Sequence, residues 1–233
     1  MIEDLDFETY LYISKDKFQI FVLNKKKLKN LYSQELKIDH QFDFKDLNIL
    51  LNFLDKNIYK IEKLIGNFIK NIILIVENEK NLKINMGIKK NYETSLKQKS
   101  FSSNLTELKD LFKKNYQDQT IMHMCIINYI IDGKRYSSFD SKLINDYFCI
   151  EVSFIAIDDK LVFVFDNLLE KYQIKIKNYM CGNYINNFIG DTGDEISIIA
   201  NKLRNGLNIN EITIVPKHKE NKGFFEKFFQ LFS

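Results

Sequence analysis

The 233-residue sequence predicts an α+β fold, and three stretches of the chain carry this prediction. Residues 9–14 and 18–23 are rich in β-forming side chains and are joined by the short polar link 15–17, which favours a hairpin. Residues 44–65 place apolar side chains at a period of about 3.6, which is typical of a helix. Residues 71–77 are almost continuously apolar, as in a strand covered on both faces. Hairpins combined with helices that cover a sheet define the α+β class.

The elements around this framework follow from the same local signals. Residues 28–38 continue the opening hairpin as a third strand, and Gly66 is the stop signal of the long helix. Residues 82–88 predict a shorter strand. The polar segment 89–104, rich in Ser and Lys, is expected to be a loose loop.

The middle of the chain predicts a short helix and then a long strand. Residues 105–116 fit the helix, with Asn104 as its cap and Glu107 at the third helical position, as in a capping box. Residues 120–131 predict a strand that turns at 132–133.

The second half predicts a partner for this strand and a further helix. Residues 147–157 are the expected partner, and a helix capped by Asp158 or Asp159 runs from there to Tyr172. Three elements follow: a strand at 174–180, a helix at 196–203 and a short extended piece at 211–215.

The bulk composition narrows the function classes. The chain is 45% hydrophobic and 28% charged, as in an ordinary globular protein, and its net charge of +3 is too small to indicate nucleic-acid binding. The start, residues 1–8, is acidic and no apolar stretch follows, so we expect no signal peptide. No run approaches the roughly 18 apolar residues of a membrane span. We expect a cytoplasmic protein whose membrane contact is peripheral.

Residues that could carry catalysis are scattered along the sequence. His40, His123 and His218 are isolated, and His123, which alternates with methionines in a strand, is expected to be structural rather than catalytic. The cysteines lie far apart without paired spacing, and predict neither a disulfide framework nor a metal site: Cys125, Cys149 and Cys181. We expect no metal, no cofactor and no enzymatic activity.

The loop at 190–194, Gly-Asp-Thr-Gly-Asp, comes closest to a phosphate-binding turn. Glycine and aspartate are first of all turn-forming residues, and no strongly apolar strand leads into this loop. Neither of the two glycine-rich phosphate-loop motifs occurs in the chain. A rebuilt phosphate loop nevertheless remains the alternative reading.

The last eleven residues, 223–233, predict an amphipathic helix. Its apolar side chains fall within one arc of roughly 160°, and a bilayer surface suits such a segment. Docking on the protein's own core is the alternative, but the polar segment 216–222 before it reads as a tether. The predicted membrane-binding residues are Phe224, Phe225, Phe228, Phe229, Leu231, Phe232, Lys222 and Lys227.

Taken together, these segments resemble FtsA, the actin-like protein that ties the bacterial division ring to the membrane. The hairpin at 11–18 is similar to the family's first phosphate-binding hairpin, and residues 121–133 look like its His-containing strand and turn. Residues 150–157 and 159–172 look like the close of the family's inserted domain, and the tail resembles its membrane-targeting helix. The resemblance implies a partial actin-like (ribonuclease H-like) lobe with an inserted FtsA-type α+β domain and a C-terminal amphipathic helix.

The resemblance also divides the chain into five parts. They are an actin-like partial lobe at 1–77, the insert domain with its return strand at 78–180, a residual segment at 181–215, the tether at 216–222 and the membrane-targeting helix at 223–233.

The chain departs from the family at the residues that bind nucleotide. Ser14 and Lys15 stand where the family has Gly-Thr, Tyr12 takes an acidic position, and Ile126 replaces a proline. The glycine-rich second phosphate motif has no counterpart after Met180, and the chain is too short for the second lobe. Since glycine is what lets the backbone approach phosphate closely, the resemblance implies a reduced relative that binds no nucleotide.

The function implied is a non-enzymatic FtsA-like adaptor that attaches cell-division components to the cytoplasmic face of the inner membrane. Its expected partners are membrane lipid, division proteins and further copies of itself. Two alternatives stay open: a PilM-like platform component of a type IV pilus or secretion system, and a nucleotide-binding actin-like ATPase.

Overall fold

The computed structural model describes most of the chain as two compact units. Among the described residues, the first unit contains those within 7–82, 118–122 and 155–205, and the second contains those within 83–117, 123–154 and 206–212. Both combine helices and strands, which confirms the α+β class. The described residues are 7–39, 42, 44, 47–91, 98–138, 147–190 and 193–212.

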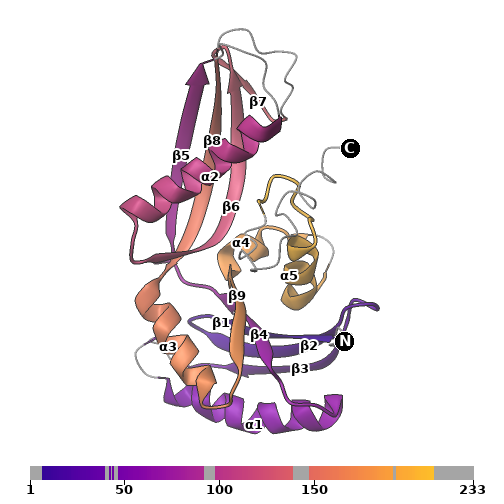
Figure 1. Ribbon diagram of the computed structural model, residues 1–233. Coiled ribbons are helices and arrows are strands. Elements are labelled where there is room, and N and C mark those ends of the chain that lie inside the picture. Colours follow the sequence, from indigo (N-terminus) through magenta and orange to yellow (C-terminus); the bar gives the residue numbers. More distant parts are fainter. Residues whose placement is uncertain are drawn as a thin grey trace. The chain divides into compact units, whose positions relative to one another are not determined.

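The first unit is built on a five-stranded sheet with the order β3-β2-β1-β4-β9 (Figure 1). β1, β2 and β3 form an antiparallel meander, as the opening of the sequence predicts. β4 then pairs with β1 in parallel, and β9 pairs with β4 in parallel. The bounds are Phe7–Ile13 for β1, Lys17–Asn24 for β2, Lys29–Lys37 for β3, Asn71–Val76 for β4 and Lys175–Cys181 for β9.

Helices cover both faces of this sheet (Figure 1). α1 (Asn48–Ile65) and α3 (Asp159–Glu170) pack on one face, and α4 (Gly182–Asn186) with α5 (Ile196–Arg204) on the other. The side chains of β4 alternate between the two cores, which confirms that this strand is buried on both sides. Ile72, Leu74 and Val76 face α1 and α3, while Ile73 and Ile75 face α4 and α5.

Local signals place most helix ends correctly. Gly66 ends α1 in the left-handed conformation (φ 69°), and its N–H donates to the Glu62 carbonyl. α1 begins at Asn48, a turn later than the periodicity predicts. At the start of α3, the Asp158 side chain caps the helix by accepting a 2.8 Å hydrogen bond from the Lys160 N–H.

The second unit contains a four-stranded sheet with the order β5-β8-β6-β7. β8 lies beside β6, so the pairing predicted for residues 147–157 is confirmed. The predicted turn at Asp132 and Gly133 leads into β7, and both residues have positive φ angles, 48° and 83°. The bounds are Leu82–Asn91 for β5, Gln119–Ile131 for β6, Lys134–Tyr136 for β7 and Tyr147–Asp158 for β8.

α2 (Gln98–Asn115) packs on this sheet, with the Phe112 ring stacked on Phe154 at 4.7 Å between centroids. Two predictions are wrong here. β5 extends to Asn91 and α2 already begins at Gln98, so the loop is far shorter than expected. Asn104 therefore lies inside the helix and does not cap it. The first turns of α2 are polar and so resemble a loop in the sequence. They are helical because the helix as a whole is stabilised by burial of its apolar face.

Candidate functional site

A cavity of about 380 Å³ lies in the first unit at the carboxyl ends of its parallel strands. β1, β4 and β9 run in the same direction, so their carboxyl ends meet at one edge of the sheet. Ligand sites of open α/β sheets gather at this edge. We call this space the carboxyl-end cavity, and its polar lining comes from Tyr12, Asp16, Lys17, Gln19, Glu77, Asn186 and Glu195.

Glu77 is the centre of the hydrogen-bond network in this cavity. It directly follows β4, and its Oε2 accepts from the Tyr12 hydroxyl at 2.5 Å and from Asn186 Nδ2 at 2.7 Å. Gly182 makes the second contact possible, because a Cβ there would lie 2.8 Å from the Glu77 Cβ and 3.1 Å from its backbone. The absent side chain lets the start of α4 pass close to Glu77, which brings Asn186 within reach.

Tyr12 is a permanent hydrogen-bond donor in this network. Burial raises the pKa of its hydroxyl well above the usual range, and the hydrogen bond to Glu77 and that carboxylate's charge raise it further. The hydroxyl therefore keeps its proton at neutral pH and donates a hydrogen bond to Glu77. It is not available as a general base.

The other polar side chains of the cavity also have partners within the protein. Asp16 Oδ1 accepts from the Ser14 hydroxyl at 2.5 Å, and Glu195 accepts from the Asn30 amide. Lys17 Nζ lies 3.9 Å from Glu35 Oε2 and 5.7 Å from the centroid of the Tyr12 ring.

The charge of the lining opposes a phosphate ligand. Three carboxylates, Asp16, Glu77 and Glu195, face the cavity against one ammonium group, Lys17. A polyphosphate would meet repulsion from these carboxylates, which is strongest where water is partly excluded. No cluster of three His, Cys, Asp or Glu side chains able to hold a metal ion occurs among the described residues. The lining suits hydrogen-bond donors and cationic groups better than anions.

The predicted membrane-binding residues, 222 to 232, lie beyond residue 212 and so outside the described residues. The loop at 190–194 is described in part. Its glycines, Gly190 and Gly193, have φ angles of 35° and 64°, as turn-forming glycines do. Ile189 and Glu195, which flank the loop, both line the carboxyl-end cavity.

His123 lies in the second unit with a buried ring, 2% exposed. Its Nδ1 is 2.6 Å from Glu211 Oε1, and residue 211 forms an antiparallel bridge with Cys125 on the same strand. The Ile126 N–H donates to the Asn210 carbonyl, and the Ile212 N–H to that of Met124. This geometry fits the structural role expected for His123, holding the segment 210–212 against β6.

Neither Glu77 nor Asn186 is predicted as a site residue by any sequence motif. One signal was available for Glu77, because an acidic residue directly after a fully buried strand lies at the edge where sites form. Asn186 had no such signal, because α4 is five residues long and its position depends on Gly182.

None of the helices in the described part of the chain is long and apolar enough to cross a membrane. No protein-family model matches the sequence, and no curated protein is found as a relative.

Solved structures give partial likenesses of low identity. One is a "PilM-PilN type IV pilus biogenesis complex", with 7% identity, a TM-score of 0.45, and 78% of this chain and 49% of that chain covered. A second is the cytoplasmic domain of EpsL, an inner membrane component of the type II secretion system of Vibrio cholerae. Its identity is 8% and its TM-score 0.33, over 75% of this chain and 55% of that one.

A third likeness is a Bacteroides thetaiotaomicron VPI-5482 protein described as having an actin-like ATPase fold and unknown function. Its identity is 15% and its TM-score 0.31, over 81% of this chain and 58% of that one. The chain thus spans about half the length of the solved structures it matches.

Proposed function

We propose that this chain is a non-enzymatic, FtsA-like adaptor that attaches cell-division components to the cytoplasmic face of the inner membrane. The observation that carries the non-enzymatic part is the carboxylate lining of the carboxyl-end cavity. A nucleotide-binding lobe needs donors and cations at this edge, whereas here Asp16, Glu77 and Glu195 outnumber Lys17.

The sheet of the first unit supports the lobe part of the proposal. Its three-stranded antiparallel meander followed by two parallel strands, in the order β3-β2-β1-β4-β9, is the arrangement of a ribonuclease H-like lobe. The hairpin between β1 and β2 lies where such a lobe would present its phosphate-binding turn. In this chain the Ser14 hydroxyl of that turn is bonded to Asp16, and Lys15 is paired with Glu79 at 3.0 Å.

The membrane part of the proposal rests on the sequence of the tail. Five phenylalanines and one leucine would lie on the apolar side of the predicted helix, and burying each would contribute about 1.5–3 kcal/mol before the costs of ordering. A single short helix therefore binds reversibly, and self-association would strengthen attachment through avidity.

Fractionation of cells tests the membrane part. Replacing Phe225 and Phe228 together by Glu should move the protein from the membrane to the soluble fraction, because two charges would enter the apolar side. The matched control is Gln230→Glu with Ser233→Glu, which adds the same charge to the polar side and should leave most of the protein on the membrane. Equal pelleting of both variants would reject tail-mediated attachment.

Calorimetry tests the non-enzymatic part. Titration of the full chain with ATP and Mg²⁺ should give no binding heat at millimolar nucleotide. Micromolar binding that is lost on Asp191→Ala would instead establish the alternative of a nucleotide-binding ATPase with a rebuilt phosphate loop at 190–194.

The second candidate function, a PilM-like platform component, differs from the proposed adaptor in the partner that it binds. A PilM-like platform component would share the lobe and the insert but bind the cytoplasmic tail of a pilus or secretion protein. Affinity capture from the native cell, followed by mass spectrometry, separates the two. Recovery of division proteins supports the proposal, and recovery of pilus or secretion proteins replaces it.

A further inference from the structure

A second hollow in the first unit, of about 530 Å³, lies at the opposite edge of the same sheet. It is bordered by the first residues of β1, the first residues of β4 and the segment that joins α1 to β4. We call it the amino-end groove. The residues used below are Glu8, Lys25, Phe68, Lys70 and Lys177, all of which line it.

The groove exists because β1 and β4 separate at their amino ends. Their parallel pairing starts at Tyr10 with Ile73 and continues toward the carboxyl ends. Before that point, within the described chain, residues 7–9 pair with β2, while residues 71–72 pair with β9. The two strands therefore leave a wedge between them.

One wall of the groove is held in place by Glu62. Its backbone carbonyl accepts from the Gly66 N–H at 2.9 Å, and its side-chain Oε1 accepts from the Ile69 N–H at 3.1 Å. Both bonds fix the connection between α1 and β4. This wall of the groove therefore needs little further ordering when a ligand enters.

Phe68 gives this fixed wall an apolar contact point. Its side chain is 78% exposed, although the neighbouring Ile69 and Ile72 are buried. A large exposed ring beside a concave surface is the kind of anchor on which binding energy concentrates. An apolar side chain of a ligand could pack between this ring and the buried residues Ile69 and Ile72, which also line the groove.

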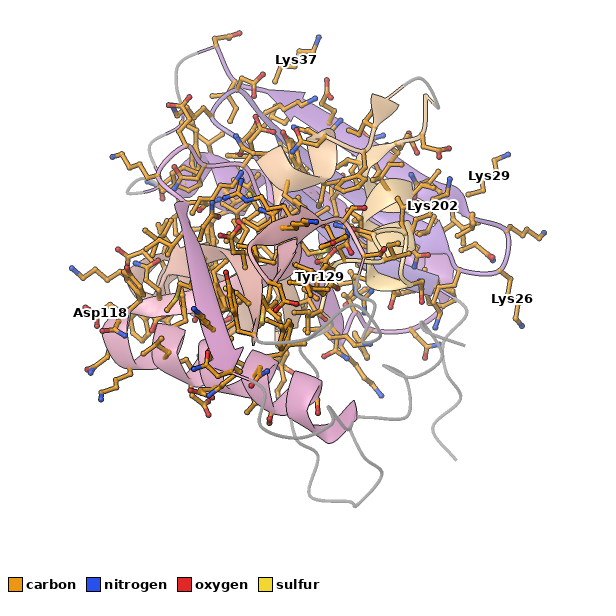
Figure 2. All side chains as sticks on the ribbon, turned by 90° about the horizontal axis from the view of Figure 1, so that it is seen from above. Lys26, Lys29, Lys37, Asp118, Tyr129 and Lys202 are labelled. Carbon is orange, nitrogen blue, oxygen red and sulfur yellow. The ribbon has the colours of Figure 1, made fainter. Side chains whose placement is uncertain are left out.

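The charge around the groove is basic. Lys25, Lys70 and Lys177 line it against one carboxylate, Glu8. That carboxylate is already paired with Arg204, whose guanidinium donates to Glu8 Oε2 at 2.8 Å, while Lys177 Nζ lies 4.0 Å from Glu8 Oε1. Figure 2 shows that Lys26, next to Lys25 in the chain, and Lys29 point outward from the ribbon. The groove therefore attracts negative charge.

We propose that the amino-end groove binds a short acidic segment of a partner protein that carries one or two large apolar side chains. The apolar residues would pack on Phe68, and the acidic residues would lie against Lys25, Lys70 and Lys177. A wedge between two strands fits an extended peptide, and the three lysines around it complement acidic side chains. The inference gives the proposed adaptor the chemistry of its partner and rests on that function.

Fluorescence anisotropy tests this with the full chain and a labelled octapeptide that has a Leu-Phe pair flanked by three aspartates on each side. The wild type should bind this probe, and should lose binding to peptides with the pair changed to glycines or the aspartates to serines. Phe68→Ser, and separately Lys70→Glu with Lys177→Glu, should each weaken binding by about tenfold or more.

The matched controls lie on α1, outside the groove. Tyr59→Ser removes a ring that is 71% exposed, and Lys56→Glu with Lys60→Glu makes the same charge change as the groove pair. Both controls should bind the probe within about twofold of the wild type. Unchanged circular dichroism and thermal midpoints establish that all variants are folded.

Three results would overturn the proposal. The first is no binding by the wild type, and the second is equal weakening by groove and control variants. The third is binding that appears only after residues 1–6 are removed, which would assign the groove to the chain's own start.

A second experiment measures binding to vesicles of anionic lipid. If the protein binds the vesicles in a way that requires the groove lysines, and does not bind the peptide, the groove is a membrane contact instead. The Phe225 and Phe228 variants test the tail, whereas the groove variants test the first unit. The proposed function and this inference can therefore fail separately.

Discussion

The two edges of the five-stranded sheet differ in charge and in how their side chains are used. At the carboxyl ends of β1 and β4, Glu77 holds two donors and carboxylates outnumber lysines. At the amino ends, lysines outnumber carboxylates and Phe68 is largely exposed. At the carboxyl ends, where open α/β sheets gather their ligand sites, Glu77 is already bonded to Tyr12 and Asn186, whereas the groove at the amino ends is the peptide site that we propose. If this comparison holds, substitutions at the first edge should affect stability, and those at the rim of the second should affect binding.

The largest effect is expected from Gly182→Val at the carboxyl-end cavity. The new side chain would start 2.8 Å from the Glu77 Cβ and 3.1 Å from its backbone, which cannot move aside without shifting β4. We expect a loss of about 3 kcal/mol in the free energy of unfolding, measured by urea denaturation. The exposed neighbour is the control, since Asn183→Ala should stay within about 0.5 kcal/mol of the wild type. A tolerated Val would mean that this edge is more open than the contacts indicate.

The next effect concerns Arg204, which ties α5 to the start of β1. Its guanidinium donates to Glu8 Oε2 at 2.8 Å, beside the Tyr10 hydroxyl at 2.7 Å from the same oxygen. Arg204→Met keeps most of the packing but leaves a half-buried carboxylate without its main partner. We expect a loss of about 2 kcal/mol at neutral pH, below the value for fully buried pairs. Chemical denaturation measures it, and an unchanged midpoint would contradict the role given to this pair.

The same pair predicts a pH dependence. Burial alone would raise the pKa of Glu8, but Arg204 and the hydrogen bond from Tyr10 hold it below its ordinary value of 4.5. A lowered pKa in the folded state means that the stabilisation is complete above pH 4.5 and is lost as the pH falls through the folded pKa. The stability difference between the wild type and Arg204→Met should therefore shrink in acid. A difference that stays constant down to pH 2 would show that charge is not its cause.

The smallest effect on stability is expected at the rim of the amino-end groove. Phe68 is 78% exposed, so Phe68→Ser removes little buried surface and should change the free energy of unfolding by less than about 0.5 kcal/mol. Thermal unfolding measures this, with Ile69→Ser as the contrast, because Ile69 is 4% exposed and its replacement should destabilise clearly. A large loss for Phe68→Ser would make the ring a structural element rather than a binding residue.

Much of the fold could be predicted because its signals are local. The link at 14–16 joins β1 to β2, one residue earlier than predicted, Gly66 ends α1 in a left-handed conformation, and the turn at 132–133 follows β6. In each case a few neighbouring residues determine the backbone conformation. The start of α2 was missed because its first turns are polar, and their helical state depends on the apolar face that follows.

The candidate site was less predictable than the fold. Tyr12 was noticed as a departure from the FtsA pattern, but its bond to Glu77 joins residues 65 positions apart. Asn186 reaches the same carboxylate across 109 positions. Nothing in the sequence around either residue specifies these pairings.

The sequence by itself determined the α+β class, the meander, the buried strand β4 and the turns, because periodicity and turn chemistry act over a few residues. Only the tertiary structure decided the strand order, the position of α4 and the contrast between the two edges of the sheet. These depend on where β1, β4 and β9 run together and where β1 and β4 separate, and such long-range pairing is a property of the packed chain.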